Sequence, residues 1–233
     1  MTSRAQDTRA RLRAAALAVV REKGVGGASA RTIAAAAGVN QALIFYHFAS
    51  VSELIEAASD EAVAARVALY REAFTDVASL SDLLAIARRV HDQERQAGSM
   101  TVMAQIMAGA QTDPVLARAA RHALASWTDE VDQVLRRVLA TSPVGPAIDG
   151  AGLAQLVSAA FVGIELYHGA DPEAADLAFS TLERLNHLVA AIEDLGPTAQ
   201  RAIRLAGSRV SRKPTPRAPA SERVGYRPPG PAD

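Results

Sequence analysis

The chain has 233 residues, with 25 basic and 25 acidic side chains and no cysteine. The absence of cysteine excludes disulfide bonds and thiolate metal sites. Hydrophobic residues make up 49% of the sequence but aromatic residues only 4%, so a core must be built mainly from Ala, Leu and Val. Alanine is the best helix former and strand-type alternation is hard to find, which predicts an all-α protein.

The balanced charge is unevenly distributed along the chain. Residues 1–50 carry seven basic and two acidic side chains, whereas residues 51–200 carry ten and twenty-one. Residues 201–233 are basic again, with eight against two. A basic head on an acidic body favours a head that meets a polyanion.

In chain order, the first fifty residues predict three helices, over residues 7–23, 30–37 and 40–46. Gly24 is expected to end the first helix and Ser29 to cap the second. Gly38 and Val39 would form a tight turn before the third. Two short helices joined by a turn that contains glycine are the helix-turn-helix pattern.

Seven further helices are predicted, over residues 52–76, 81–96, 100–110, 113–140, 150–169, 172–194 and a last one up to 205. Asp113 before Pro114, and Asp171 before Pro172, are strong start signals. Ser50 or Ser52, and later Ser81, are candidate caps.

Six of the eleven prolines follow Gly207, among Arg, Ser and Gly, so we expect a disordered tail there. The predicted organisation is a helix-turn-helix head over residues 1–50, a larger helical bundle over residues 51–206 and a basic, proline-rich tail over residues 207–233.

No Lys, Arg, Asp or Glu occurs between Arg31 and Glu53, a stretch long enough to suggest a membrane span. The polar side chains of Asn40, Gln41 and His47 argue against one. We therefore expect a cytoplasmic protein without a membrane partner.

A combination of short motifs occupies about 48 residues between Thr8 and Ile55. Its members are Ala15, Ala16, Glu22, Lys23, Gly24, Ile33, Ala34, Ala37, Gly38, Val39, Tyr46, His47, Phe48, Glu53 and Leu54. This combination resembles the N-terminal DNA-binding domain of the TetR family of bacterial transcriptional regulators. The resemblance implies a homodimer that binds double-stranded DNA, and a helical body that binds a small-molecule effector.

The residues of the second and third helices are expected to divide into two sets. Ile33, Ala37, Val39, Ile44 and Phe48 can form a small core, which leaves the remaining side chains of the third helix to face outward. By resemblance, the third helix lies in the major groove. The predicted DNA-binding residues are Ser29, Arg31, Asn40, Gln41, Ala42, Leu43, Phe45, Tyr46 and His47.

Gln41, together with Asn40, is the candidate base reader, because a glutamine amide can make two hydrogen bonds to adenine. Ala42 and Leu43 can contact thymine methyl groups. The resemblance assigns phosphate contacts to Tyr46 and His47. It places Arg31 against a phosphate or base, and Ser29 at a helix N-terminus that can present backbone N–H groups.

Two positions depart from the family pattern. Phe45 stands where the family usually has a second tyrosine, and Val51 stands where it usually has lysine. Each change removes one phosphate contact, so we expect weaker non-specific DNA affinity than is typical of the family.

Adaptable methionine and aromatic side chains predict a ligand site in the body, although the same residues could be plain core. The candidates are Phe74, Met100, Met103, Met107, Trp127, Phe161, Glu165, Tyr167 and His168. Because Arg118 and Arg121 are the nearest basic residues expected, an uncharged or cationic, largely apolar effector is favoured.

Residues 153–167 and 177–192 are apolar over much of their faces, and the resemblance implies that they form the dimer interface. The candidates are Leu156, Ala160, Gly163, Ile164, Leu182, Leu185, Val189 and Ile192. Packing within one chain is the alternative explanation.

Glu165 and His168 form a Glu-x-x-His unit, two of which build the metal centre of di-iron bundles. No second unit is present, so no metal or cofactor is expected and the protein is not expected to be an enzyme. We favour a ligand-responsive repressor on a palindromic operator. The alternatives are a DNA-binding regulator without an effector and a helical metalloenzyme. The basic tail is a candidate for extra non-specific DNA affinity, or a solvated segment without a role.

Overall fold

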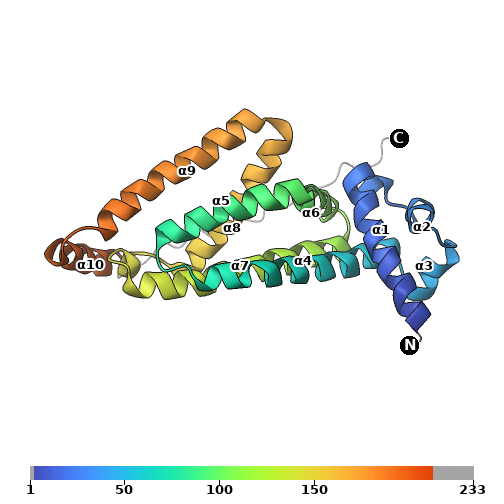
Figure 1. Ribbon diagram of the computed structural model, residues 1–233, viewed down its shortest axis with the longest axis horizontal. Helices are drawn as coiled ribbons and strands as arrows, with labels where there is room; N and C mark the ends of the chain where they lie inside the picture. Colours follow the sequence, from blue (N-terminus) through green and yellow to red (C-terminus); the bar gives the residue numbers. More distant parts are fainter. Residues whose placement is uncertain (1–2, 212–233) are drawn as a thin grey trace, which may run out of the picture.

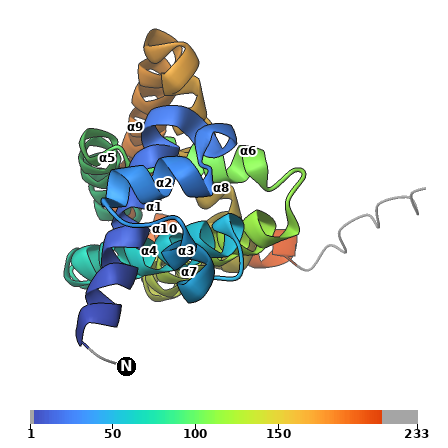
Figure 2. The same cartoon turned by 90° about the vertical axis from the view of Figure 1, so that its right-hand side faces the viewer.

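The computed structural model describes residues 3–211, in which all regular secondary structure is helical, as predicted. Three helices form a head at one end of an elongated molecule (Figure 1): α1 (Ser3–Gly27), α2 (Ala30–Ala37) and α3 (Ala42–His47). Figure 2 looks onto this end and shows α2 and α3 in front, with no other helix covering them.

The body consists of α4 (Val51–Thr75), α5 (Leu80–Ala97), α6 (Ser99–Gly109), α7 (Pro114–Thr141), a short 3-10 turn η1 (Gly145–Ala147), α8 (Gly150–Ala170), α9 (Pro172–Glu193) and α10 (Pro197–Ser211). Helices α4 and α7 lie side by side along its length (Figure 1). Helix α9 lies on the opposite side of the molecule from α4 and α7, packed against α5 and α8.

Side-chain caps fix where the body helices begin. Ser50, rather than Ser52, accepts a hydrogen bond from the Glu53 N–H at the start of α4. Ser79 caps α5 through a reciprocal pair of bonds with Asp82, so this helix begins one residue before the predicted start, and Ser81 is not its cap. Such caps satisfy N–H groups that the helix cannot pair internally.

Glycines set two of the bends. Helix α1 is interrupted at Gly24, whose φ of 70° lies in the left-handed region, and one more turn then runs to Gly27. The prediction ended the helix at the same point but missed this turn. Gly38 ends α2 with a φ of 62°, and the tight turn to α3 follows.

The head and the body share one hydrophobic cluster. Leu12 and Ile33 of the head pack in the same cluster as Leu54 of α4, Ile106 of α6 and Leu116 of α7. A second cluster lies within the body, around Leu135. Since apolar contacts cross the predicted domain boundary at residue 50, a change of packing at Leu54 of α4 or Ile106 of α6 reaches the head directly.

Part of the predicted tail is ordered. Helix α10 continues to Ser211, and Gly207 is buried against Ala147, where an added Cβ would lie 2.9 Å from the Ala147 side chain. The rest of the predicted tail, with Arg212, Lys213, Arg217, Arg223 and Arg227, lies outside the described residues.

Candidate nucleic-acid interface and internal cavity

A small core holds α2 and α3 at a fixed angle. Ile33 of α2 and Ile44 of α3 are completely buried, and Ala37 and Phe48 are nearly so. Val39, in the turn, packs against the same cluster. All five residues were predicted for this core, and their burial leaves the other side chains of α3 on the outside.

The outer face of α3 carries the predicted base-contacting residues. Asn40, Gln41 and Ala42 are exposed, as are Phe45 and Tyr46, whose exposed fractions are 55% and 79%. Large exposed aromatic side chains are uncommon on a protein surface that has no partner.

The other predicted contacts surround this face. Leu43 and His47 are half-buried, with the His47 ring between those of Tyr46 and Phe48, while Ser29 and Arg31 are exposed near the start of α2. All nine predicted residues therefore reach the surface of the head.

Asn40 has a structural task that the prediction missed. Its side-chain Oδ1 accepts a hydrogen bond of 2.8 Å from the Ala42 N–H, and its carbonyl accepts from the Leu43 N–H. Asn40 therefore stabilises the turn that leads into α3, and only its amide NH₂ group is left to face a base edge. Asn side chains often accept a hydrogen bond from the backbone N–H two residues on, so an Asn just before a short helix was the available signal.

The start of α2 is closed by a reciprocal pair of hydrogen bonds. The Ser29 hydroxyl accepts from the Thr32 N–H, and the Ser29 N–H donates to the Thr32 hydroxyl at 2.9 Å. This pairing fixes the N-terminus of α2, but it also occupies the Ser29 N–H, which is therefore not available to a phosphate.

Two arginines of α1 help to build the head. The guanidinium of Arg11 donates to the carbonyls of Ala37 and Gly38, at 2.6 and 3.3 Å, and so ties α1 to the end of α2. Arg9 lies over the Phe48 ring, 4.9 Å from its centroid. Both lie on α1, which begins at Ser3, four residues before the predicted start.

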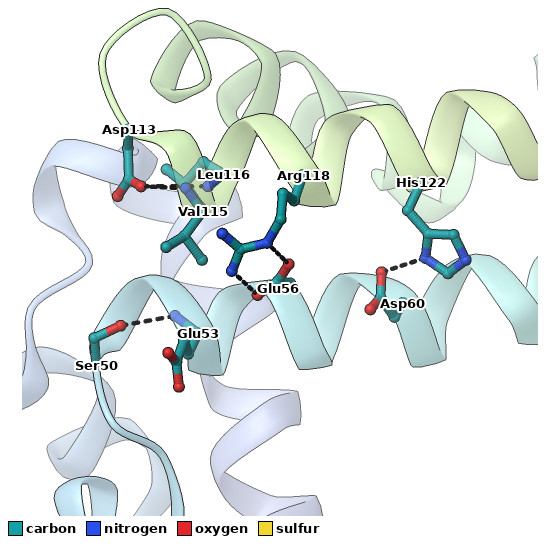
Figure 3. A network of polar contacts seen from close by, with 9 residues as sticks. All are labelled: Ser50, Glu53, Glu56, Asp60, Asp113, Val115, Leu116, Arg118 and His122. Carbon is teal, nitrogen blue, oxygen red and sulfur yellow. Dashed lines mark hydrogen bonds and ion pairs between the residues drawn. The ribbon is translucent and has the colours of Figure 1, made fainter.

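Polar bonds join α4 to α7 just beyond the head (Figure 3). The Ser52 hydroxyl donates to Asp113, Arg118 makes two bonds of 3.1 Å to Glu56, and His122 lies 2.7 Å from Asp60. The carboxylate of Asp60 raises the pKa of His122. Such exposed pairs add little stability, but this ladder fixes the register of the two helices.

The body encloses a cavity of about 390 Å³ between α1, α4, α5, α6, α7 and α8. Five of the nine predicted ligand residues line it: Phe74, Met100, Met103, Trp127 and Phe161. Small-molecule sites typically have this size and a mostly apolar wall.

The remaining four predicted ligand residues lie elsewhere. Met107 packs against the cluster shared by head and body, and Tyr167 is largely exposed on α8. Glu165 and His168 lie on α8 beside α5, and neither lines the cavity.

Two arginines and one glutamate, none of them predicted, are the charged residues of the cavity wall. They are Arg21, Arg66 and Glu94. The expectation that Arg118 and Arg121 are the nearest basic residues is therefore wrong. Arg21 on α1 and Arg66 on α4 are far in sequence from Met100, Met103, Trp127 and Phe161, so their place in the same wall could not be seen from the sequence.

Glu94 is buried and fully engaged. It accepts hydrogen bonds of 2.7 Å from the Arg66 guanidinium and from the Tyr70 hydroxyl. Burial, and then the bond to Glu94, raise the pKa of Tyr70 to about 12, so Tyr70 remains a donor at neutral pH. Arg66 and Glu94 thus form a neutral pair in the wall.

Residues 12–58 match the family model described as "Bacterial regulatory proteins, tetR family". The N-terminal domain of this chain belongs to the TetR family. No match was found among curated proteins.

Solved structures resemble most of the chain. A putative TetR-family transcriptional regulator from Rhodococcus sp. has 21% identity and a TM-score of 0.65, over 81% of this chain and 100% of that chain. Salmonella enterica GusR has 22% identity and a TM-score of 0.64, over 81% and 96%. FadR from Bacillus subtilis, in complex with stearoyl-CoA, has 14% identity and a TM-score of 0.62, over 80% and 99%. Identities this low establish a shared fold, so the body has the fold of TetR-type regulators.

Helices α8 and α9 of this TetR-type body expose an apolar face. Leu156 and Leu185, both predicted for the dimer interface, are more than half exposed. Gly163, also predicted, would meet no atom within 4 Å if it carried a Cβ. Ile164 and Leu182 instead pack within the chain, against Ala175 and Phe179.

The rest of this face is mixed. Ala160, Val189 and Ile192, the last three predicted residues, are half-buried. The sequence prediction missed Leu166, Leu177 and Leu188, which are all exposed. Leu177 and Leu188 continue the stripe that contains Leu185, since helical spacing places them on one side of α9.

Helix α8 is also the one helix in residues 3–211 whose length and composition would allow it to cross a membrane, with 21 residues and a mean hydropathy of 1.3. One such helix is weak support for a membrane protein, since an apolar interface helix has the same composition.

His91 of α5 and Glu165 of α8 form a buried pair, with His91 Nδ1 against Glu165 Oε1 and both side chains at most 5% exposed. Burial lowers the pKa of His91 and raises the pKa of Glu165 to about 7. We infer that below pH 7 the two groups form a neutral pair, with a protonated Glu165 carboxyl facing the imidazole. In the described residues no group of three or more His, Cys, Asp or Glu could hold a metal ion.

Proposed function

We propose that this chain is a dimeric, ligand-responsive transcriptional regulator: a repressor that binds a palindromic operator and is released by a small, mostly apolar molecule. The observation that carries the proposal is the exposed, uncharged outer face of α3 on a TetR-family head. Hydrogen-bonding and apolar groups on such a face suit base edges, while the surrounding basic and polar groups suit phosphates. The expected location is the cytoplasm.

The exposed stripes of α8 and α9 support the dimer. Leu156, Leu185 and Leu188 would be buried between two copies, and Gly163 would allow the two α8 helices to approach closely. A two-fold axis between copies presents two heads, and two heads match a palindrome.

The cavity supports an effector over the alternative of a regulator without one. Its wall belongs to six helices, and one of them is α1 of the head. FadR, which shares the fold, is described in complex with stearoyl-CoA, a small molecule with a long apolar tail. A ligand that fits one spacing of the heads better than another shifts the population toward it, and DNA is released if that spacing misses the half-sites.

A helical metalloenzyme remains the third hypothesis. Glu165 of its Glu-x-x-His unit is paired with His91 of α5. Metal analysis of the purified protein separates this hypothesis from the other two, because only an enzyme of that kind would contain stoichiometric iron or manganese.

Selection of bound duplexes from random DNA tests the proposal. A palindromic or near-palindromic motif is expected. If no motif is enriched, the protein is not a sequence-specific regulator, whatever ligands it binds.

Gln41→Ala is expected to cost about 1–3 kcal/mol on the best selected duplex and to relax one base position, because the amide that reads that base is lost. Titration of the selected duplex and of single-base variants measures both effects. Gln93→Ala, on an exposed position of α5, is the matched control. An equal loss of affinity for all duplexes would show that Gln41 does not read a base.

His47→Ala is expected to weaken binding to all of these duplexes by the same factor, because a phosphate contact does not depend on sequence.

Met103→Trp is expected to abolish effector-induced DNA release and to leave DNA binding without effector intact. Met103 lines the cavity and has no place in the DNA-contacting face, so the larger side chain fills ligand space only. Gel-shift titration with and without effector is the measurement. A retained response would place the effector outside the cavity.

A further inference from the structure

The cavity of this chain reaches the DNA-binding head itself. Ala14, Leu17, Ala18 and Arg21, all on α1, form part of its wall. A ligand in this cavity would therefore contact α1 of the head directly, with no other helix between the ligand and α1. The other walls are mainly Ala, Val, Leu and Met, so the charged groups among them decide what kind of ligand fits.

One positive charge of this wall is left without an acidic partner. Arg66 and Glu94 neutralise each other. The hydrogen bond given for Arg21 goes from its Nη1 to the carbonyl of Ala97, at 3.2 Å, and no acidic side chain in residues 3–211 pairs with it. The wall therefore carries one uncompensated cation, at an exposed position on α1.

The geometry around Gly98 positions this arginine. Gly98 ends α5 with a φ of 71°, and an added Cβ would lie 2.8 Å from the Arg21 Cδ. The Arg21 side chain thus lies across bare backbone, with its guanidinium at the carbonyl end of α5. Carbonyls at a helix C-terminus attract a cation, but a single neutral acceptor is a weaker partner than a carboxylate, which can accept two bonds from one guanidinium.

We propose that the effector is an amphipathic monoanion, an apolar molecule with one carboxylate, and that Arg21 binds this carboxylate. The apolar part occupies the space between Met103 and Phe161, and the carboxylate replaces the Ala97 carbonyl as the partner of Arg21. Loss of that bond frees α1 from the end of α5, and this is how the head senses the ligand. The inference rests on the proposed function and replaces the uncharged or cationic effector expected from the sequence.

Three probes of equal chain length test the charge: decanoate, decanol and decylamine, each below its micellar concentration, with the full-length protein. Decanoate is expected to raise the melting temperature most, decanol less, and decylamine least. Decanoate is also expected to weaken binding to the selected duplex. Equal shifts from decanoate and decanol, or a larger shift from decylamine, would overturn the inference.

Arg21→Met tests the residue. It should weaken decanoate binding by about tenfold or more and leave decanol binding nearly unchanged, because only the charged bond is lost. Arg21→Lys should retain part of the preference for decanoate. Arg121→Met, an exposed arginine on α7 that does not line the cavity, is the control. Unchanged decanoate affinity in Arg21→Met would overturn the assignment.

Failure of the proposed function and failure of the proposed ligand class give different results. If no duplex is enriched but decanoate still binds through Arg21, the proposed function fails and the ligand class stands. If a palindrome is enriched and decanoate does not bind, the regulator stands and the monoanion fails.

Discussion

Leu188→Glu is expected to convert the protein to a monomer and to weaken binding to a palindromic duplex by about a hundredfold or more. Leu188 is 63% exposed on α9, in the stripe that also contains Leu177 and Leu185. In the proposed dimer this side chain is buried against the second copy. A carboxylate placed there loses its hydration and gains no partner, which costs several kcal/mol per copy.

The effect on DNA follows from the separation of the two heads. One head makes half of the contacts, and a dimer holds its second head at high effective concentration beside the second half-site. A monomer loses that advantage while its single-site contacts remain. Affinity for an isolated half-site should therefore change little.

Leu69→Glu is the control, since Leu69 is 61% exposed on α4, outside the stripes of α8 and α9. Sedimentation equilibrium gives the oligomeric state, and gel-shift titration gives the affinity for palindrome and half-site. A Leu188→Glu protein that remained dimeric would exclude this face as the interface.

The local sequence pattern was sufficient to predict which helices form the head. Helical spacing alone separates buried Ile44 from exposed Ala42 and Phe45, because α3 is a short helix with one buried side. Gln41 lies three residues before Ile44, so spacing would place it on the buried side, but it precedes the first residue of α3 and is exposed. The turn that the Asn40 side chain closes was missed, although Asn is a favoured residue in such turns.

The cavity was predictable only in part. Met103 and Phe161 were found because their residue types suit an apolar site. Arg21 could not be found, since nothing in the sequence tells that α1 passes over the end of α5 at Gly98. Sequence spacing gives the faces of one helix, but which faces meet depends on how the helices pack.

The same limit hid the partner of Glu165. In the sequence, the nearest candidate was His168, one helical turn away on α8. In the structure the carboxyl of Glu165 lies against His91, on α5. Contacts between helices outcompete those along one helix whenever burial makes an unpaired polar group costly.

Glu165→Gln is expected to stabilise the protein increasingly as the pH rises, by about 3 kcal/mol at pH 8 relative to pH 4.5. Burial raises the pKa of Glu165 to about 7, from the 4.5 of an ordinary glutamate. Between these two values the folded protein holds a proton that the unfolded chain has released. The contribution of Glu165 to stability is therefore fully present below pH 4.5 and is lost as the pH rises through 7.

The groups around the pair act in both directions. Arg95 of α5 favours the ionised carboxylate, while Asp92 and Glu94 of the same helix oppose it, and burial outweighs all three. His168 of α8 lies beside Arg95, and α9 contributes the Phe179 ring next to His91. Arg88 of α5 forms ion pairs with Asp92 and with Glu183 of α9.

Replacing Glu165 with glutamine removes the ionisation of this side chain but keeps its contact with His91. Its amide can still donate to His91 Nδ1, so folding at low pH should be nearly unchanged, but it cannot lose a proton at high pH. Urea unfolding of both proteins at half-unit steps from pH 4.5 to 8 gives the difference in the free energy of unfolding. Glu183→Gln, which changes an exposed carboxylate on α9, should show a much flatter difference. A difference that stayed flat or fell with pH for Glu165→Gln would contradict this prediction. It would mean that Glu165 is already ionised at low pH and paired with a charged His91. A buried ion pair, and not a neutral pair, would then join α5 to α8.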